Sequence, residues 1–197
     1  MGANTEPKSY IAGADGSGLR QLPPMEGRSG TLVWSPDQKF VYVSIWRHRT
    51  SETWKWTMNG SNPEKFVNAC GEVWDADPSG KYLLEALYLG EKTGIYEVSI
   101  SEGKCIPLLP GVVTSGATFA PDGRSFLYAV TSRGEATIYR QPWRDGKLIG
   151  EPQVALKVPF VFPLEYQGNA YDFSKDLSTI VYARPGGQAD LYLLSRK

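Results

Sequence analysis

The sequence has no excess of charge of either sign. Its 197 residues include 21 Lys or Arg and 21 Asp or Glu, so the formal net charge is zero. Binding to nucleic-acid phosphates or to an anionic membrane surface needs a basic face, and the chain has no run of like charges that would build one. We therefore expect no nucleic-acid partner.

Long hydrophobic runs are also missing. The longest, near residues 158–164, is interrupted by Pro159 and Pro163 and is too short to span a bilayer. Residues 1–8 are polar and lack the apolar core of a signal peptide. We expect no direct membrane insertion of this segment. Because the chain reads as though it begins within a repeat, the missing signal does not define a compartment.

Histidine and cysteine are too scarce for most catalytic or metal sites. His48 is the single histidine, and the charges of Arg47 and Arg49 would favour its neutral form. There is no Gly-x-Ser-x-Gly elbow to support a hydrolase triad, and one His with two Cys cannot form a zinc tetrad without carboxylates. We expect no catalytic residue, no metal and no cofactor.

What the sequence does contain is a repeated hairpin. The chain is rich in Gly, Pro, Trp and Tyr, a composition typical of short strands joined by turns. A strand, a tight turn of the Pro-Asp-Gly type and a second apolar strand recur four times. Taking equivalent turn positions, the spacings are 42, 43 and 54 residues. The four copies begin at Trp34, Ala76, Phe119 and Phe173.

A period of about 40 to 45 residues with four strands in each unit is typical of a β-propeller blade. We therefore predict an all-β fold, a β-propeller of four-stranded antiparallel blades, as one region over residues 1–197. About four blades are present, and we interpret the chain as part of a larger propeller. The alternative is a small closed ring, in which residues 19–22 dock beside residues 191–194. An open arc would expose a sheet face and favour self-association. The predicted units are a partial blade at 9–22 and blades at about 31–68, 72–109, 117–157 and 169–194.

Strand direction assigns the connections to two faces. The Pro-Asp-Gly turns share one face, where Asp37 and Asp122 are expected to hydrogen-bond the backbone. The second-to-third loops and the crossings between blades share the other face, where propellers usually bind. Aromatic and charged side chains concentrate there, and they are our candidate binding residues: Trp46, Arg47, His48, Arg49, Tyr88, Arg133, Phe162, Glu165, Tyr166 and Arg184.

The two cysteines fall at opposite faces in this assignment. Cys70 lies in the crossing into the second blade, and Cys105 begins the outer strand of that blade. A five-residue strand separates the faces by about 16 Å, beyond the roughly 7 Å between Cα atoms that a disulfide allows. We therefore predict two free thiols and no disulfide.

The repeated hairpins resemble the TolB-like propeller repeat over nearly the whole chain, although the second hairpin has Asp-Pro-Ser-Gly and the fourth lacks both Pro and Gly. The stretches at 94–100, 119–129, 139–150 and 182–194 are similar to the extreme C-terminus of acidobacterial membrane-anchored serine/threonine kinases. This resemblance implies an extracytoplasmic, periplasmic sensor domain. The chain contains no Gly-rich nucleotide loop, His-Arg-Asp or Asp-Phe-Gly motif, so the resemblance does not imply phosphotransfer.

Two functions remain open at this stage. The first is a non-catalytic propeller that binds a protein or peptide as the sensor part of a larger bacterial signalling protein. The alternative is the propeller cap of a serine peptidase of the prolyl oligopeptidase type. A propeller enzyme would need acids on inner strands, where Glu72, Asp75 and Asp172 are the candidates. We do not expect it to be an enzyme.

Overall fold

A computed structural model gives the structure of the chain. It describes residues 9–23, 26–47, 50–58, 63–66, 70–114, 116–132, 134–159, 171–173, 179–184 and 190–195. The described residues form consecutive antiparallel sheets, joined in chain order. The predicted fold class, an all-β propeller arrangement of antiparallel blades that forms part of a propeller, is confirmed.

Each sheet is made from strands that follow one another along the chain. The N-terminal sheet has β1 (Tyr10–Ile11) and β2 (Arg20–Gln21). The first blade has β3 (Arg28–Trp34), β4 (Phe40–Arg47), β5 (Thr50–Thr57) and β6 (Glu64–Lys65). The second blade has β7 (Glu72–Ala76), β8 (Tyr82–Leu87), the short 3-10 helix η1 (Gly90–Lys92), β9 (Gly94–Ser99) and β10 (Cys105–Pro110).

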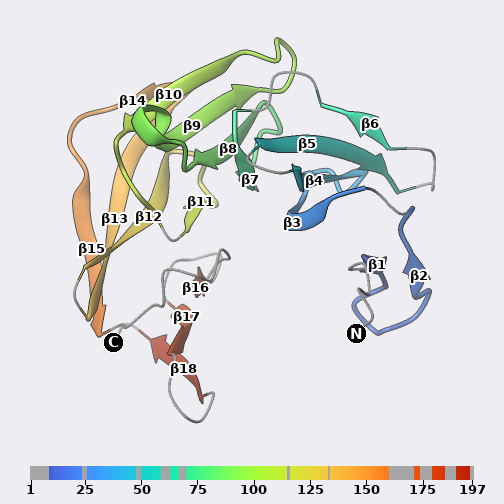
Figure 1. Cartoon of the computed structure of the whole chain (residues 1–197). Coiled ribbons are helices and arrows are strands. Elements are labelled where there is room, and N and C mark those ends of the chain that lie inside the picture. The colour runs from blue at the N-terminus through green and yellow to red at the C-terminus, as the bar shows by residue number, and fades with distance from the viewer. Residues whose placement is uncertain are drawn as a thin grey trace, which may run out of the picture.

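The third blade has β11 (Ala117–Phe119), β12 (Ser125–Ser132), β13 (Glu135–Arg144), β14 (Lys147–Leu148) and β15 (Gln153–Pro159). Its β13 pairs with both β14 and β15, because the chain turns back at Asp145-Gly146 before the outer strand begins. The terminal sheet has β16 (Tyr171–Phe173), β17 (Thr179–Arg184) and β18 (Asp190–Ser195). Figure 1 shows the sheets following one another around an arc, with the N-terminal and terminal sheets at its two ends.

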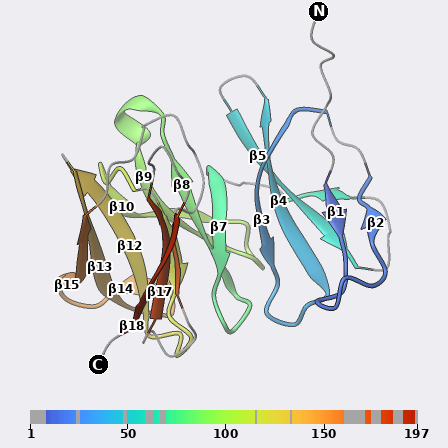
Figure 2. The ribbon, with the colours of Figure 1, turned by 90° about the horizontal axis from the view of Figure 1, so that it is seen from below.

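The turn chemistry predicted for the repeated hairpins is present. In the β3–β4 turn, the Asp37 carboxylate accepts hydrogen bonds from the Ser35 hydroxyl at 2.7 Å and from the Lys39 amide at 3.1 Å. In the β11–β12 turn, Asp122 accepts a 2.9 Å bond from the Arg124 amide. These bonds fix the tight reversal between the two strands. In Figure 2 the β3–β4 and β7–β8 turns lie together at the lower edge of the sheets.

Apolar clusters join neighbouring blades. Between the first and second blades, the buried side chains of Val33, Tyr42, Val73, Leu83 and Val98 form one cluster. A larger cluster contains residues of the second and third blades. Strands β4 and β5 also pack against the N-terminal sheet. The core is therefore divided among successive interfaces between sheets, as in other repeat architectures.

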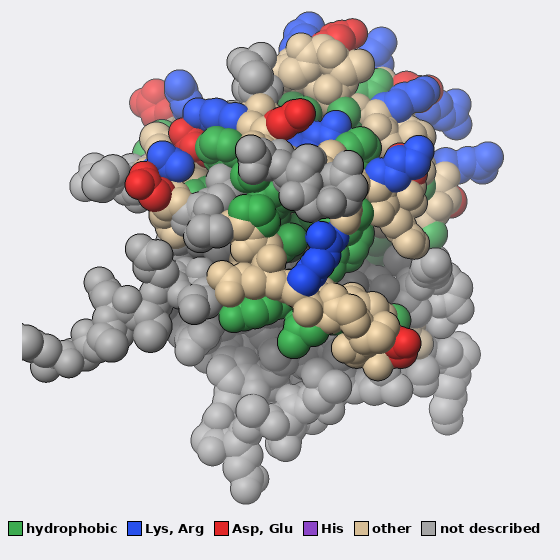
Figure 3. All heavy atoms as spheres, turned by 90° about the vertical axis from the view of Figure 1, so that its right-hand side faces the viewer, with side chains coloured by type: hydrophobic (Ala, Val, Ile, Leu, Met, Phe, Trp, Pro, Cys, Tyr) green, Lys and Arg blue, Asp and Glu red, His purple; other side chains and the backbone are tan. Residues whose placement is uncertain are grey.

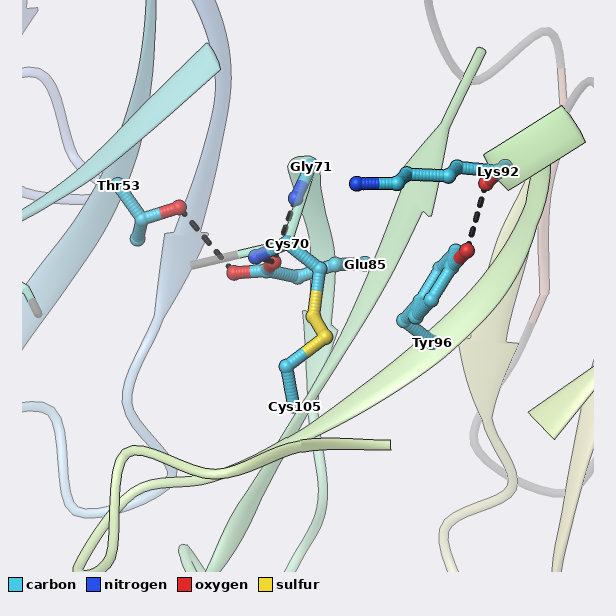
Figure 4. The surroundings of a disulfide bond; sticks show 7 residues. All are labelled: Thr53, Cys70, Gly71, Glu85, Lys92, Tyr96 and Cys105. Atoms are coloured by element: carbon cyan, nitrogen blue, oxygen red, sulfur yellow. Dashed lines mark hydrogen bonds between the residues drawn. A yellow bond between two sulfur atoms is a disulfide. The ribbon is translucent and has the colours of Figure 1, made fainter. Parts of the chain in front are cut away.

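The prediction of two free thiols is wrong, because Cys70 and Cys105 form a disulfide with their Cα atoms 6.0 Å apart (Figure 4). The error was to place the crossing at the rim of the blades. The amide of Cys70 donates a hydrogen bond to Glu85, which lies in the middle of β8. Cys70, Phe66 and Cys105 all pack against the apolar cluster between the first two blades. The end of the crossing therefore places Cys70 inside the interface between the first two blades, next to the first residue of the outer strand β10.

Candidate binding face

The connections that are not Pro-Asp-Gly turns gather on one face. The β4–β5 hairpin and the β8–β9 connection, which carries η1, lie together at the upper edge in Figure 2, opposite the β3–β4 and β7–β8 turns. We call the side that carries the β4–β5, β8–β9 and β12–β13 connections the loop-rich face. The described candidate residues Trp46, Arg47 and Tyr88 lie at the strand ends on this side.

Trp46 is half-buried at the end of the first blade. It pairs with Arg28 of β3 and Ser51 of β5 at the end of the first blade. A Cβ atom at Gly30 would lie 3.1 Å from the Trp46 indole nitrogen and 2.7 Å from the Glu72 carboxylate. The absence of a side chain at Gly30 is what gives the indole and the carboxylate room. The side chain of Trp46 therefore lies beside Gly30 and is half-buried.

Arg47 belongs to a charged cluster on the first blade. Its guanidinium Nε lies 3.6 Å from the Glu52 carboxylate, which also accepts a 2.7 Å hydrogen bond from Lys65. The Trp54 indole donates to the same carboxylate at 3.3 Å. The hydrogen bond from Lys65 is the main reason that the pKa of Glu52 lies below its ordinary value. Ion pairs of this kind near the surface contribute little stability. The main effect of the cluster is to place two positive charges and one negative charge close together on the first blade. Figure 3, which views the molecule from the right-hand side of Figure 1, shows acidic and basic side chains interspersed there.

Tyr88 ties the second blade to the crossing that leads to the third. Its hydroxyl donates a 2.6 Å hydrogen bond to the Thr114 carbonyl, and its ring lies against Trp74 with the centroids 6.5 Å apart. A second bond, from the Gly111 amide to the Thr93 carbonyl at 2.7 Å, joins the same two segments. The predicted binding residue Tyr88 therefore positions this part of the face.

Two apolar side chains on these segments were not among the predicted binding residues. Leu89 is 46% exposed and Val113 is 55% exposed, although both belong to connections that hydrogen bonds hold together. We call the surface formed by residues 88–93 and 111–114 the loop–crossing surface. Leu89 directly follows the predicted binding residue Tyr88, whereas Val113 has no aromatic or charged residue beside it in the sequence. Both residues could have been predicted by searching the loops of the predicted binding face for apolar side chains.

The remaining predicted site residues cannot be placed at the level of side chains. Arg184 ends strand β17, where the structure describes the backbone. The other six lie outside the described residues: His48, Arg49, Arg133, Phe162, Glu165 and Tyr166.

The acids proposed for an enzyme channel have structural partners. Glu72 accepts hydrogen bonds from the amide and the hydroxyl of Thr31, at 3.1 and 2.7 Å. Asp75 accepts bonds from the Thr118 hydroxyl and the Phe119 amide, at 2.6 and 2.7 Å. The first set of bonds joins β7 to β3 and the second joins β7 to β11. These carboxylates therefore connect adjacent blades. The side chain of Asp172 lies outside the described part.

Two more carboxylates are buried between blades. Glu85 accepts hydrogen bonds from Thr53 of the first blade at 3.2 Å and from the Gly71 amide at 2.9 Å. Its burial raises its pKa to about 7. Glu97 accepts a 2.8 Å bond from the Trp143 indole of the third blade, and burial also raises its pKa. A carboxyl group with a raised pKa is a common feature of catalytic sites, but both groups here lie within apolar interfaces between sheets and bond to the neighbouring blade.

Among the described residues, no three His, Cys, Asp or Glu side chains are grouped as metal ligands would be. The same part of the chain has no helix with the length and apolar character needed to cross a bilayer.

The fold is that of a β-propeller. TolB from Acinetobacter baumannii superposes with a TM-score of 0.69 and 18% identity, over 95% of this chain and 46% of that one. A putative TolB from Agrobacterium tumefaciens gives 0.67 and 17%, over 98% and 71% of the two chains. A structure of the nidogen/laminin complex gives 0.66 and 13%, over 88% and 64%. The chain thus spans less than half the length of the first of these proteins.

At these identities the likeness concerns the fold alone. No protein-family model matches the chain, and no curated protein matches its sequence.

Proposed function

We propose that this propeller is a non-catalytic recognition module that binds a protein or peptide through its loop-rich face. The observation that carries the proposal is the loop–crossing surface. Leu89 and Val113 expose about half of their side chains on two segments that the bonds from Tyr88 and Gly111 hold together. Exposed apolar side chains on a fixed backbone bind a partner with little loss of conformational entropy, and rigid propeller loops are a common place for such contacts.

The larger context of this module is a sensor part of a signalling protein, such as a bacterial receptor kinase. The similarity of the C-terminal stretches to membrane-anchored kinases supports this proposal. The Cys70–Cys105 disulfide supports an extracytoplasmic location, because disulfides persist in oxidising compartments such as the periplasm.

Peptide selection tests the binding face. A displayed library of random peptides is selected against the protein, and the affinity of the selected peptides is measured for the double variant Leu89→Ser, Val113→Ser. The matched control is Ile149→Ser, Val154→Ser, which removes two apolar side chains of similar exposure from the third blade. We expect most selected peptides to bind the first variant at least about tenfold more weakly, which is a loss of about 1.4 kcal/mol, and the control normally.

Peptides that lose affinity for the control variant instead would place recognition on the third blade and contradict the proposal. A selection in which no peptide distinguishes the two variants would contradict it as well. Folding of each variant is checked by its unfolding midpoint, since exposed positions of this kind usually change stability by less than about 0.5 kcal/mol.

A further inference from the structure

The disulfide lies at the start of the second blade, beside residues 70–72, which we call the entry segment. Cys70 precedes strand β7 by two residues, and Cys105 is the first residue of the outer strand β10. Both cysteines are half-buried, whereas Val73 and Leu83 of the same apolar cluster have no exposed surface. Access is one of the factors that set the rate of thiol–disulfide exchange. The bridge is therefore within reach of an external dithiol.

Three contacts hold the entry segment to the second blade. The disulfide joins Cys70 to β10, and the amides of Cys70 and Gly71 both donate hydrogen bonds to the Glu85 carboxylate on β8. Figure 4 shows the bridge, this carboxylate and Gly71 close together. The backbone at Gly71 also lies directly against β8, since a Cβ atom there would be 2.2 Å from the Ala86 carbonyl oxygen. Because the contacts meet on two adjacent residues, a shift of Cys70 changes the others as well.

The last residue of the entry segment carries the contact to the first blade. Glu72 accepts hydrogen bonds from the Thr31 amide and hydroxyl, at 3.1 and 2.7 Å. Its carboxylate also lies beside Gly30, where an added Cβ atom would be 2.7 Å from it and 3.1 Å from the Trp46 indole nitrogen. The position of the entry segment therefore determines how the second blade meets β3 at the end that carries Trp46.

Reduction of the bridge requires Cys70 to move. The sulfur atoms of two thiols are no longer bonded, so they have to separate to non-bonded contact. Cys105 is held in the β9–β10 ladder opposite Val98, whereas Cys70 lies outside the strands of the described part of the chain. The separation is therefore taken up by Cys70 and by the residues of the entry segment that follow it.

We propose that the Cys70–Cys105 bridge is an exchange site for a dithiol, and that its reduction releases the entry segment and weakens the contact of Glu72 with the first blade. A thiolate of the dithiol attacks one sulfur of the bridge, the S–S bond breaks, and the electron pair goes to the other sulfur, which takes up a proton. The second thiol of the reagent then displaces the remaining protein sulfur, which also takes up a proton. The protein gains two thiols, and the dithiol becomes a disulfide.

Hydrogen exchange on the full chain, followed by NMR before and after treatment with dithiothreitol without denaturant, tests the proposal. The Phe119 amide is the matched control, because it donates a 2.7 Å bond to another β7 carboxylate, Asp75, which joins β7 to the third blade. We expect a thiol reagent to count two thiols after the treatment. Exchange of the Thr31, Cys70 and Gly71 amides should accelerate at least about tenfold more than exchange of the Phe119 amide.

Two variants test the steps separately. Cys70→Ser, Cys105→Ser should show the fast exchange with and without dithiothreitol. Glu72→Ala should exchange the Thr31 amide rapidly in both redox states, while the Gly71 amide still responds to reduction. The proposal is overturned if the bridge of the unmutated protein stays intact in dithiothreitol. It is also overturned if reduction accelerates the Thr31 amide no more than the Phe119 amide, since reduction would then only lower the global stability.

Discussion

Replacement of Glu85 by Gln should remove a large pH dependence of stability. The Glu85 carboxyl group is 1% exposed and accepts hydrogen bonds from Thr53, Cys70 and Gly71. Burial is the main cause of its raised pKa, and the three bonds, which favour the ionised form, oppose the rise. A Gln at this position keeps the shape and can still accept the two amide bonds. The Thr53 hydroxyl can rotate to accept a bond from the new amide group.

The sign follows from proton binding. With a pKa of about 7 in the folded protein and 4.5 as its ordinary value, the folded state holds the proton more tightly than the unfolded state. Ionisation of Glu85 therefore destabilises the fold. Stability falls as the pH rises from about 4.5 to about 7, and the total loss is about 3 kcal/mol. Between about pH 5 and pH 8 the expected loss is roughly 2.5 kcal/mol.

Urea unfolding of the wild type and of Glu85→Gln at about pH 5 and about pH 8 measures this loss. The contributions of all other titrating groups to the pH dependence are the same in both proteins, so they cancel when the two free energies of unfolding are subtracted. The advantage of the wild type over the variant should decrease by roughly 2.5 kcal/mol between the two pH values. A difference that is the same at both pH values would refute the reasoning. It would mean that Glu85 is ionised across this range or that water reaches it in the folded state.

Two further predictions concern the joints between structural units. The disulfide links residues 35 positions apart, so replacing both Cys70 and Cys105 by Ser should lower the free energy of unfolding by about 3 to 4 kcal/mol in the chain-entropy estimate; two thiols that react in the denatured, unreduced protein would contradict the bridge. Asp75→Ala should cost about 1 to 3 kcal/mol in chemical unfolding, because it leaves the buried Phe119 amide without its acceptor, and a loss below about 0.5 kcal/mol would show that the bond is replaced.

The hairpins could be predicted from the sequence because their determinants are local. Pro, Asp and Gly within a few residues define the turn, and the Asp37 and Asp122 carboxylates bond to the neighbouring backbone as their positions implied. The repeat then predicts the order of strands within a blade. The fold class required no information beyond these patterns and their spacing.

The path of the crossings could not be predicted in this way. Strand β6 has two residues, and the chain then enters the interface, where Cys70 meets Cys105 and donates to Glu85. That depth depends on contacts between residues of different blades, which no repeat period encodes. The same applies to the exposure of Leu89, which depends on how η1 packs beside the next crossing.

The acids that bond between blades explain why the copies of the repeat differ from one another. The second blade carries Glu72 and Glu85, which accept hydrogen bonds from Thr31 and Thr53 of the first blade. On its other side, Asp75 and Glu97 accept bonds from the third blade.

An unpaired carboxylate in these interfaces would be costly, so each acid is suited to one neighbour with a donor at the right position. Apolar packing alone would allow any blade to stand beside any other, since cores tolerate varied apolar residues of similar volume. The acids therefore make the order of the blades specific. Exchanging the second and third blades should destabilise the protein even though the apolar pattern of each is retained, because the exchange separates these acids from their donors.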